Sequence, residues 1–506
     1  MTLSPSEAGP LRMPWKKGIA VGRAYELLRA DLLTHLTICQ REIGFEFCRF
    51  HALFHDEMAV VRRDATGNLV YQWRFVDEIF DRLRSVGLRP FVELNPMPSA
   101  LASGKQRMFW YGMNVTPPRD MAEWSELVSA FARHCIDRYG RAEVRQWYFE
   151  VWNEPNLGAF WAGSQADYFE LYAASARALT AVDPELRVGG PATASARWIP
   201  ELIEHCGRTG TPLDFVSTHT YAQDEFVQYP DRAASPHDPG EFFADAFRRV
   251  QREVADSARP DLEIHWTEWN TQQAHDAASV TWSHNRSVDA LEGGSFVARE
   301  CVALDGTCDS MFYWVASDLF EEGGPMTAPF SQTYGLLTMD GLPKATFNAM
   351  RLLARMRGDR LKISELALAH PGCGAVATRE GVVTRLLLWN HPIPGLSAAN
   401  WSVDVSLPGE QWFLVRVTAG AGSPFERWLE MGQPQNLSPV AREALAYAAV
   451  PSVAVVSPMP DYRLEVGPGE VVWIEARPME SGKQDSLDKL AELEVQLGQY
   501  GKVTPS

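Results

Sequence analysis

The chain has 506 residues, of which 46% are hydrophobic and 22% charged, and its formal net charge is −17. This length exceeds what one hydrophobic core usually serves, so we expect a large domain with a companion, and the composition excludes a disordered or collagen-like chain. The negative charge argues against a nucleic-acid-binding protein, which needs a basic surface for phosphates. A neutral or small polar substrate fits better.

Cysteine spacing gives no sign of a disulfide framework or a zinc site. The seven cysteines are odd in number and lack any C-x-x-C spacing. The first residues lack the basic, apolar and small-residue order of a signal peptide, and no run of about 18 uncharged apolar residues occurs. We therefore expect a cytoplasmic protein that has no membrane or nucleic-acid partner.

From Arg41 to about Trp314, short apolar runs alternate with longer amphipathic stretches. This order is typical of a parallel sheet with helices outside it. The predicted strands lie near residues 18–21 and at 44–51, 89–95, 147–154, 186–192, 214–221, 262–270 and 309–316. Helices are predicted at Tyr71–Ser85, Met121–Tyr139, Ala166–Ala181 and Lys344–Met356, where apolar residues recur at three and four positions. The pattern predicts an α/β fold, a (β/α)8 TIM barrel over residues 15–358.

The sequence pattern changes after the predicted barrel. Stretches such as "GAVATREGVVTRLLLWNHP" and "VVWIEARP" are typical of short strands broken by Gly, Pro and Asn, with no long helical pattern between them. We expect an accessory β-sandwich over residues 359–480, joined by residues 1–14. In the tail, 481–506, leucines at positions 487, 490, 493 and 497 predict a short helix, for which packing on the body, a role in assembly, or fraying stay open.

Two glutamates close predicted strands at the barrel end where reacting groups of such folds stand. Glu154 ends the fourth strand, and Pro155 disfavours helix before it, which sets Glu154 at a strand-to-loop corner. Glu268 ends the seventh strand in "IHWTE". Such a pair suits glycoside hydrolysis, in which one carboxyl group donates a proton and the other attacks the sugar or activates water. The alternative is two unrelated surface acids, each beside an arginine or a helix N-terminus.

Several stretches around these residues resemble those of a known family. They are "FHALFHDEM" (50–58), "NVTPP" (114–118), "YFEVWNEPN" (148–156), "STHTY" (217–221), "HWTEWN" (265–270) and "YWVASDLFEE" (313–322). Together they resemble glycoside hydrolase family 39, the β-xylosidases and α-L-iduronidases, from about Gly18 to Met356. The Asn-Glu-Pro unit alone is shared by the wider clan of retaining barrel glycosidases. The resemblance implies Glu154 as acid/base, Glu268 as nucleophile and Asn153 as the contact to the sugar 2-hydroxyl.

His219 and Tyr221 alternate on the predicted sixth strand, so both side chains can point to one face. The resemblance places them near the nucleophile and the sugar, where the tyrosine hydroxyl would orient the attacking carboxylate. The alternative is a hydrogen-bonded core pair without a catalytic role.

Five further residues are candidates for binding a terminal sugar. His51 and His55 follow the second strand, and Glu321 and Glu322 stand in "DLFEE", so these four would bind outer hydroxyls. Trp314 would form an apolar floor beneath the sugar ring. The alternatives are loop histidines, helix-capping acids and a barrel-top aromatic residue.

Charges in mid-strand positions are expected to pair beneath the site, because an unpaired buried charge is costly. They are Arg49, Glu93 and Glu150. His265 and Glu268 are three residues apart, so strand alternation would put them on opposite faces. We therefore expect no metal ion, and no cofactor.

The function expected from the sequence is a retaining, exo-acting β-xylosidase that releases xylose from the non-reducing ends of short xylo-oligosaccharides. One rival is an α-L-iduronidase or another retaining glycosidase of the same family, although the acidic "FEE" sequence argues against an enzyme that must hold a sugar carboxylate. A rival of another class is a non-catalytic carbohydrate-binding protein, which would need neither carboxylate. Whether the protein forms a homo-oligomer stays open.

Overall fold

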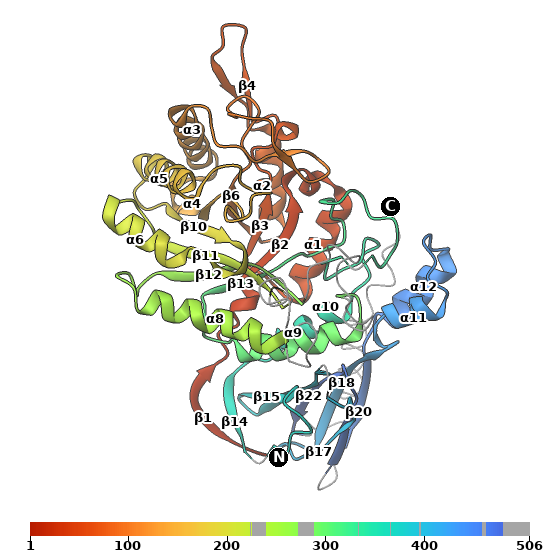
Figure 1. The fold of residues 1–506 in the computed structure, drawn as a ribbon. Coiled ribbons are helices and arrows are strands. Elements are labelled where there is room, and N and C mark those ends of the chain that lie inside the picture. The colour runs from red at the N-terminus through yellow and green to blue at the C-terminus, as the bar shows by residue number, and fades with distance from the viewer. Residues whose placement is uncertain are drawn as a thin grey trace.

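A closed barrel of eight parallel strands forms the centre of the computed structural model (Figure 1). The structure describes residues 1–222, 224, 239–271, 288–331, 333–364, 366–393, 396–457 and 462–478. In chain order the barrel strands are β2 (Gly18–Arg23), β3 (Phe47–His51), β6 (Arg89–Leu94), β9 (Tyr148–Val151), β10 (Arg187–Thr193), β11 (Phe215–Tyr221), β12 (Glu263–Asn270) and β13 (Ser310–Tyr313). Pairing of β13 with β2 closes the ring, which confirms the predicted TIM barrel.

Helices surround the barrel (Figure 1). They are α1 (Ala30–Glu42), α2 (Arg74–Ser85), α3 (Met121–Tyr139), α4 (Arg141–Val144), α5 (Gln165–Val182), α6 (Ile199–Thr209), α8 (Pro239–Ala255), α9 (Leu291–Ala303) and α10 (Ala345–Leu353). Helix α3 has the predicted bounds. Helix α2 begins at Arg74 rather than Tyr71, because β5 (Leu69–Tyr71) pairs with β4 (Val61–Arg63) in a hairpin that projects from the body.

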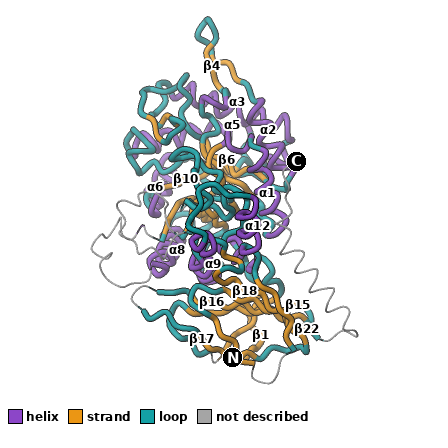
Figure 2. The backbone as a smooth tube through the Cα atoms, turned by 90° about the vertical axis from the view of Figure 1, so that its right-hand side faces the viewer, coloured by secondary structure: helices purple, strands orange, loops and turns teal. Residues whose placement is uncertain are grey.

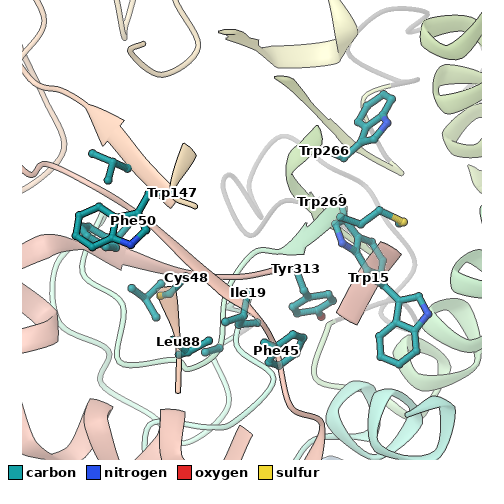
Figure 3. Packing of buried hydrophobic residues seen from close by; sticks show 14 of the residues in the cluster. Trp15, Ile19, Phe45, Cys48, Phe50, Leu88, Trp147, Trp266, Trp269 and Tyr313 are labelled. Atoms are coloured by element: carbon teal, nitrogen blue, oxygen red, sulfur yellow. The ribbon is translucent and has the colours of Figure 1, made fainter. Parts of the chain in front are cut away.

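Strand β12, which carries Glu268, is anchored by two tryptophans that lie in the layer between barrel and helices. The Trp266 ring stacks on Phe247 of α8 with a centroid distance of 3.8 Å. The ring centroid of Trp269 lies 5.9 Å from that of Phe243, which is also on α8. Figure 3 shows both tryptophans in the packed cluster of buried hydrophobic residues. The buried rings hold the end of β12 in place.

A bulge interrupts β12 just before Glu268. Thr218 of β11 pairs with Trp266, but the next residue, His219, pairs with Glu268, so Thr267 is an extra residue. Bulges break the alternation of side chains and are common beside active sites. Here the bulge lets Thr267 and Glu268 both point into the barrel.

The expectation that His265 and Glu268 lie on opposite faces is wrong, because the bulge shifts the alternation. His265 packs inside the barrel against Phe91, Tyr148 and Phe215, at centroid distances of 5.5, 4.6 and 5.1 Å. The two residues therefore face the same interior, with His265 in a lower aromatic layer and Glu268 at the carboxyl end of the strand.

A sheet that is antiparallel except for the short β19 follows the barrel and packs against it. In spatial order its strands are β1 (Thr2–Pro10), β14 (Asp359–Ser364), β15 (Cys373–Glu380), β16 (Val383–Asn390), β22 (Val471–Arg477), β18 (Gln411–Ala419) and β19 (Gly422–Ser423), with β20 (Ser452–Val456) on β18. One face contacts α9, as Figure 2 shows. The other face is covered by the ribbon of β17 (Trp401–Val405) and β21 (Tyr462–Val466), with which it shares a hydrophobic core.

We propose that the chain divides into a catalytic barrel at 15–358 and an accessory β-sandwich at 1–14 and 359–480. The antiparallel pairing of β1 with β14 supports this division, because it joins the N-terminal segment to the accessory sheet. The predicted tail helix at 481–506 lies outside the described residues. Among the described helices, none is long and apolar enough to cross a membrane.

The accessory region contains two helices that the sequence pattern did not predict. They are α11 (Phe425–Glu430) and α12 (Pro439–Ala448). The hydroxyl of Ser438 accepts a hydrogen bond from Ala441 N at the start of α12, and Pro439 occupies its first turn. The helices are short and flanked by Pro and Gly, which hid their periodicity. Their apolar residues pack with Phe330 and Leu342 of the loop after β13.

Candidate active site

Glu154 stands at a sharp corner directly after β9. Trp152 and Glu154 have left-handed backbone conformations, with φ of 70° and 44°. Such conformations are strained for residues other than glycine and concentrate at functional sites. The backbone N–H of Glu154 donates to the carbonyl of Ala192, at 2.8 Å, and so ties the corner to β10.

Glu154 and Glu268 meet at the carboxyl end of the barrel, and both are buried, with exposed fractions of 8% and 4%. A carboxylate oxygen of each and a ring nitrogen of His219 all lie within 4.8 Å of one another. The residues come from three strand ends, those of β9, β11 and β12. The barrel thus brings together groups that are far apart in the sequence.

Glu268 is held by two hydrogen-bond donors. Arg49 Nη1 donates to its Oε1 at 2.8 Å, and the Tyr221 hydroxyl donates to its Oε2 at 2.7 Å. Burial raises the pKa of Glu268 to about 6, against the opposing effects of the Arg49 cation, His51 and the Tyr221 hydroxyl. Both donors favour the ionised form, so Glu268 is suited to act as a carboxylate.

The surroundings of Glu154 instead favour its protonated form. Burial, followed by the negative charge of Glu268, raises the pKa of Glu154 well above its ordinary value. Its Oε1 lies 3.0 Å from His219 Nδ1. Burial lowers the pKa of His219 well below its ordinary value, so this ring is neutral. Two carboxyl groups with environments this different are suited to the separate roles of acid and carboxylate.

A fully buried arginine joins the parts of the site from below. Arg49 Nε donates to Glu150 at 2.6 Å, and Nη2 donates to Asn153 Oδ1 at 2.8 Å. Nη2 also lies 2.8 Å from Glu93. The expectation that Arg49, Glu93 and Glu150 pair with one another beneath the site is confirmed. Together with its bond to Glu268, Arg49 fixes the carboxylate and Asn153 relative to each other.

Three of the residues predicted to bind a terminal sugar lie beside the carboxylate pair. His51 Nε2 is 3.5 Å from Glu268 and 3.7 Å from Glu322, while Nδ1 is 2.8 Å from Glu93. The Trp314 ring lies against the His51 ring, with centroids 4.6 Å apart. His51, Trp314 and Glu322 therefore form one wall next to Glu268.

Sequence reasoning missed an aromatic residue on this wall. Phe109 stacks on His51, with ring centroids 6.3 Å apart and an angle of 23°. It also contacts Phe160 from the loop after β9, at 5.3 Å. Phe109 lies in the turn between β7 (Arg107–Met108) and β8 (Met113–Asn114), which is too short to show periodicity. The adjacent aromatic residues of "FWY" were the only available signal.

The other two predicted sugar ligands have protein partners at the rim. The Glu321 carboxylate pairs with Arg23 at 2.6 Å and with Arg29 at 3.1 Å. His55 Nδ1 accepts from the backbone N–H of Glu57 at 3.3 Å. Residues with such contacts are suited to support the rim of the site. A direct contact of His55 or Glu321 with the sugar stays a prediction.

Comparison with known proteins identifies the family. The profile of Glycosyl hydrolases family 39 matches residues 3–462. The chain belongs to this family. A protein named β-xylosidase from Caldicellulosiruptor saccharolyticus is 37% identical over 450 residues, which are 87% of this chain and 89% of that protein. Another from Geobacillus stearothermophilus is 34% identical over 449 residues, 86% of each chain. The protein is therefore a glycoside hydrolase.

A solved structure supports the same assignment. The family 39 β-xylosidase from Caulobacter crescentus superposes with a TM-score of 0.78 at 32% identity. The match covers 93% of this chain and 98% of that one, so it includes both the barrel and the sheet that follows it.

Glu154, His219 and Glu268 are close enough together to be considered as metal ligands. In this family 39 enzyme their atoms already have protein partners. His219 is bonded through both ring nitrogens, to Glu154 and to Thr267. Glu268 accepts hydrogen bonds on both oxygens. The arrangement fits proton transfer and nucleophilic attack, and the absence of a metal stays a prediction.

Replacing Arg49 with Met should destabilise the fold strongly. The change leaves Glu93, Glu150 and Glu268 buried without their cation, and breaking a buried ion pair from one side costs about 3–5 kcal/mol. The free energy of unfolding, measured by urea denaturation, should fall by that amount. Arg133→Met is the matched control, because Arg133 pairs with Glu126 at the surface, where such pairs contribute about 1 kcal/mol or less. Equal losses in the two variants would contradict this account of Arg49.

Proposed function

We propose that the enzyme is a retaining, exo-acting β-xylosidase that releases xylose from the non-reducing ends of short xylo-oligosaccharides. The approach of Glu154 and Glu268, with carboxylate oxygens within 4.8 Å, carries the proposal. Retaining glycosidases hold the two carboxyl groups about 5–5.5 Å apart, whereas inverting enzymes separate them by about 6.5–9.5 Å to admit a water molecule. The relatives named β-xylosidase support xylose as the sugar.

In the first step, the ionised Glu268 attacks the anomeric carbon and Glu154 donates its proton to the departing glycosidic oxygen. Arg49 and Tyr221 hold both oxygens of Glu268, which orients the carboxylate. The products of this step are a covalent glycosyl-enzyme and the released sugar or aglycone.

In the second step, Glu154 acts as a base and takes a proton from the water that attacks the glycosyl-enzyme. Esterification removes the negative charge of Glu268, and that charge is one of the causes of the raised pKa of Glu154. The pKa of Glu154 therefore falls when the intermediate forms, and its carboxylate is available at the stage at which a base is needed.

Asn153 is proposed to bind the sugar 2-hydroxyl. Arg49 donates to Asn153 Oδ1, so the amide NH2 group is left to face the substrate. A hydrogen bond to the 2-hydroxyl strengthens in the transition state of retaining enzymes, which makes Asn153 a contributor to rate as well as to binding.

Exo action requires a pocket that is closed beyond the terminal sugar. The loop after β13 is tied down through Glu321, which pairs with Arg23 and Arg29. The carbonyl of Glu322 accepts from the backbone N–H of Trp110, at 2.9 Å, in the turn between β7 (Arg107–Met108) and β8 (Met113–Asn114). These ties support a fixed wall in which His51, Trp314 and Glu322 contact the terminal sugar.

The site favours a xyloside over an α-L-iduronide, whose sugar carboxylate needs a cation. Arg23 is engaged by Glu57 and Glu321, and Arg49 by Glu150 and Glu268. Both cations are thus neutralised by the protein. A role in carbohydrate binding alone would not need two buried carboxylates, whose desolvation is costly.

The proposal is tested by comparing substrates. The enzyme should hydrolyse aryl β-xylosides in preference to other aryl glycosides, and its cleavage of xylobiose should far outpace the loss of viscosity of xylan. A rapid fall in viscosity would mean cleavage in mid-chain and would overturn the exo assignment. Preference for an aryl iduronide would overturn the assignment of the sugar. Cytoplasmic residence stays a prediction, and the state of assembly stays open.

A further inference from the structure

A series of hydrogen bonds runs from Glu154 to the fully buried carboxylate of Glu150. His219 Nδ1 lies 3.0 Å from Glu154 Oε1, and His219 Nε2 lies 3.1 Å from the hydroxyl of Thr267. The Thr267 hydroxyl donates to Glu150 Oε1 at 2.7 Å. His219, Thr267 and Glu150 are fully buried, so water does not compete for these bonds. Thr267 faces the barrel interior two residues after His265, and the bulge in β12 lets the next residue, Glu268, face inward beside it.

The direction of each hydrogen bond follows from the group at the far end of the series, Glu150. Glu150 Oε2 accepts from Arg49 Nε at 2.6 Å, in a buried ion pair that holds Glu150 as an ionised acceptor. The single proton of the Thr267 hydroxyl therefore points to Glu150, and its oxygen must accept from His219 Nε2–H. A neutral imidazole has one N–H, so His219 Nδ1 carries a lone pair. The bond between Nδ1 and Glu154 then requires the proton to be on Glu154.

We propose that Glu150 and Thr267 are positioning residues that set the tautomer of His219 and thereby hold the proton on Glu154 in the resting enzyme. The proposal rests on the proposed function in one respect, the role of Glu154 as acid/base. Neither residue touches the substrate in this scheme. They act through His219.

The reverse direction of these hydrogen bonds is disfavoured by the charges around Glu154. The groups that face it from other elements are Glu268 on β12, Asp224 after β11, Glu322 after β13 and Arg49 on β3. In the reverse direction, Glu154 would be ionised within 4.8 Å of the buried carboxylate of Glu268. Like charges this close in a buried site are strongly unfavourable. The burial that lowers the pKa of His219 also supports a neutral ring.

The series of hydrogen bonds also affects the second step of the reaction. After Glu154 has given its proton to the leaving group, its carboxylate faces the lone pair of His219 Nδ1. An anion opposite a lone pair is destabilised, so Glu154 recovers a proton readily from the attacking water. The fixed tautomer thus favours proton return in each turnover.

The first test reads the tautomer directly. Nitrogen NMR of the enzyme labelled with ¹⁵N-histidine distinguishes a protonated from an unprotonated ring nitrogen, and His219→Gln assigns the signals by their loss. We expect His219 Nε2 to be protonated and Nδ1 unprotonated at neutral pH. A protonated Nδ1 in the resting enzyme would overturn the proposal. This measurement does not depend on catalysis, so it stands even if the proposed function fails.

The second test uses two substitutions of nearly equal size. Thr267→Val keeps the branched side chain but removes the acceptor for Nε2–H, so the proton should move to Nδ1 and favour an ionised Glu154. We expect the alkaline limb of the pH profile of kcat/KM for xylobiose to move about one pH unit lower. A shift of this size corresponds to the free energy of about one hydrogen bond. Thr267→Ser keeps the hydroxyl and should keep the pH profile of the parent enzyme.

An unshifted limb in Thr267→Val would assign Thr267 a packing role only and overturn the proposal. Failure of the proposed function has a different signature. In that case Glu154→Ala would retain the alkaline limb of the parent enzyme, while the NMR signals of the parent would still report the unprotonated Nδ1 that the proposal requires.

Discussion

Replacing Glu154 with Ala should slow the cleavage of xylobiose by about 10²- to 10⁴-fold, the usual contribution of a general acid. An activated aryl xyloside should still be attacked at nearly the parent rate in the first step, because its leaving group departs as a stable anion. The defect should therefore depend on the substrate. Single-turnover release of the aryl group and steady-state cleavage of xylobiose measure the two effects separately.

The same variant lacks the base of the second step, so the glycosyl-enzyme should accumulate. Azide needs no base and should restore turnover of the aryl xyloside as a xylosyl azide of retained configuration. Glu126→Ala is a suitable control, since the Glu126 side chain is 58% exposed at the surface. Equal losses of Glu154→Ala on xylobiose and on the aryl xyloside would contradict the assignment of Glu154 as acid/base.

Replacing Glu268 with Ala should abolish both activities alike, because the attacking group itself is gone. The loss should exceed the roughly 10⁴-fold limit typical of acid–base catalysis alone, whichever leaving group is used. Azide can enter the space left by the carboxylate and attack the aryl xyloside directly, so any rescued product should have inverted configuration. Product analysis by NMR distinguishes this azide from the retained product of Glu154→Ala.

A Glu268→Ala variant that kept most of its activity would show that another group attacks the sugar. The opposite configurations of the two rescued azides are the sharper criterion, since a variant that merely folds poorly would yield neither product. Far-ultraviolet circular dichroism of both variants completes the comparison.

Much of the fold followed from local sequence patterns. The barrel strands and helix α3 were predictable because their apolar residues have a clear period, and the strand-end positions of Glu154 and Glu268 followed from that topology. Pairing of Arg49 with Glu93 and Glu150 was also predictable, since buried charges must be compensated. These features depend on local periodicity or on a simple rule about burial.

Other features depend on contacts between distant segments and gave no local signal. The bulge at Thr267 is defined by its register with β11, and it reversed the expected direction of the side chains that follow. The partners of Glu321 are Arg23 and Arg29, far away in the sequence. Phe109 reaches the site from the short turn between β7 and β8. Sequence periodicity cannot reveal such arrangements, because each is set by how two separate elements meet.

The roles proposed for Glu154 and Glu268 require a double displacement with net retention at the anomeric carbon. The most direct test is proton NMR of the first xylose released from an aryl β-xyloside, recorded before the anomers interconvert. With retention, β-xylose should be formed first, and the α anomer should appear later at the rate of mutarotation. Initial formation of α-xylose would show inversion and would contradict the roles assigned to both glutamates.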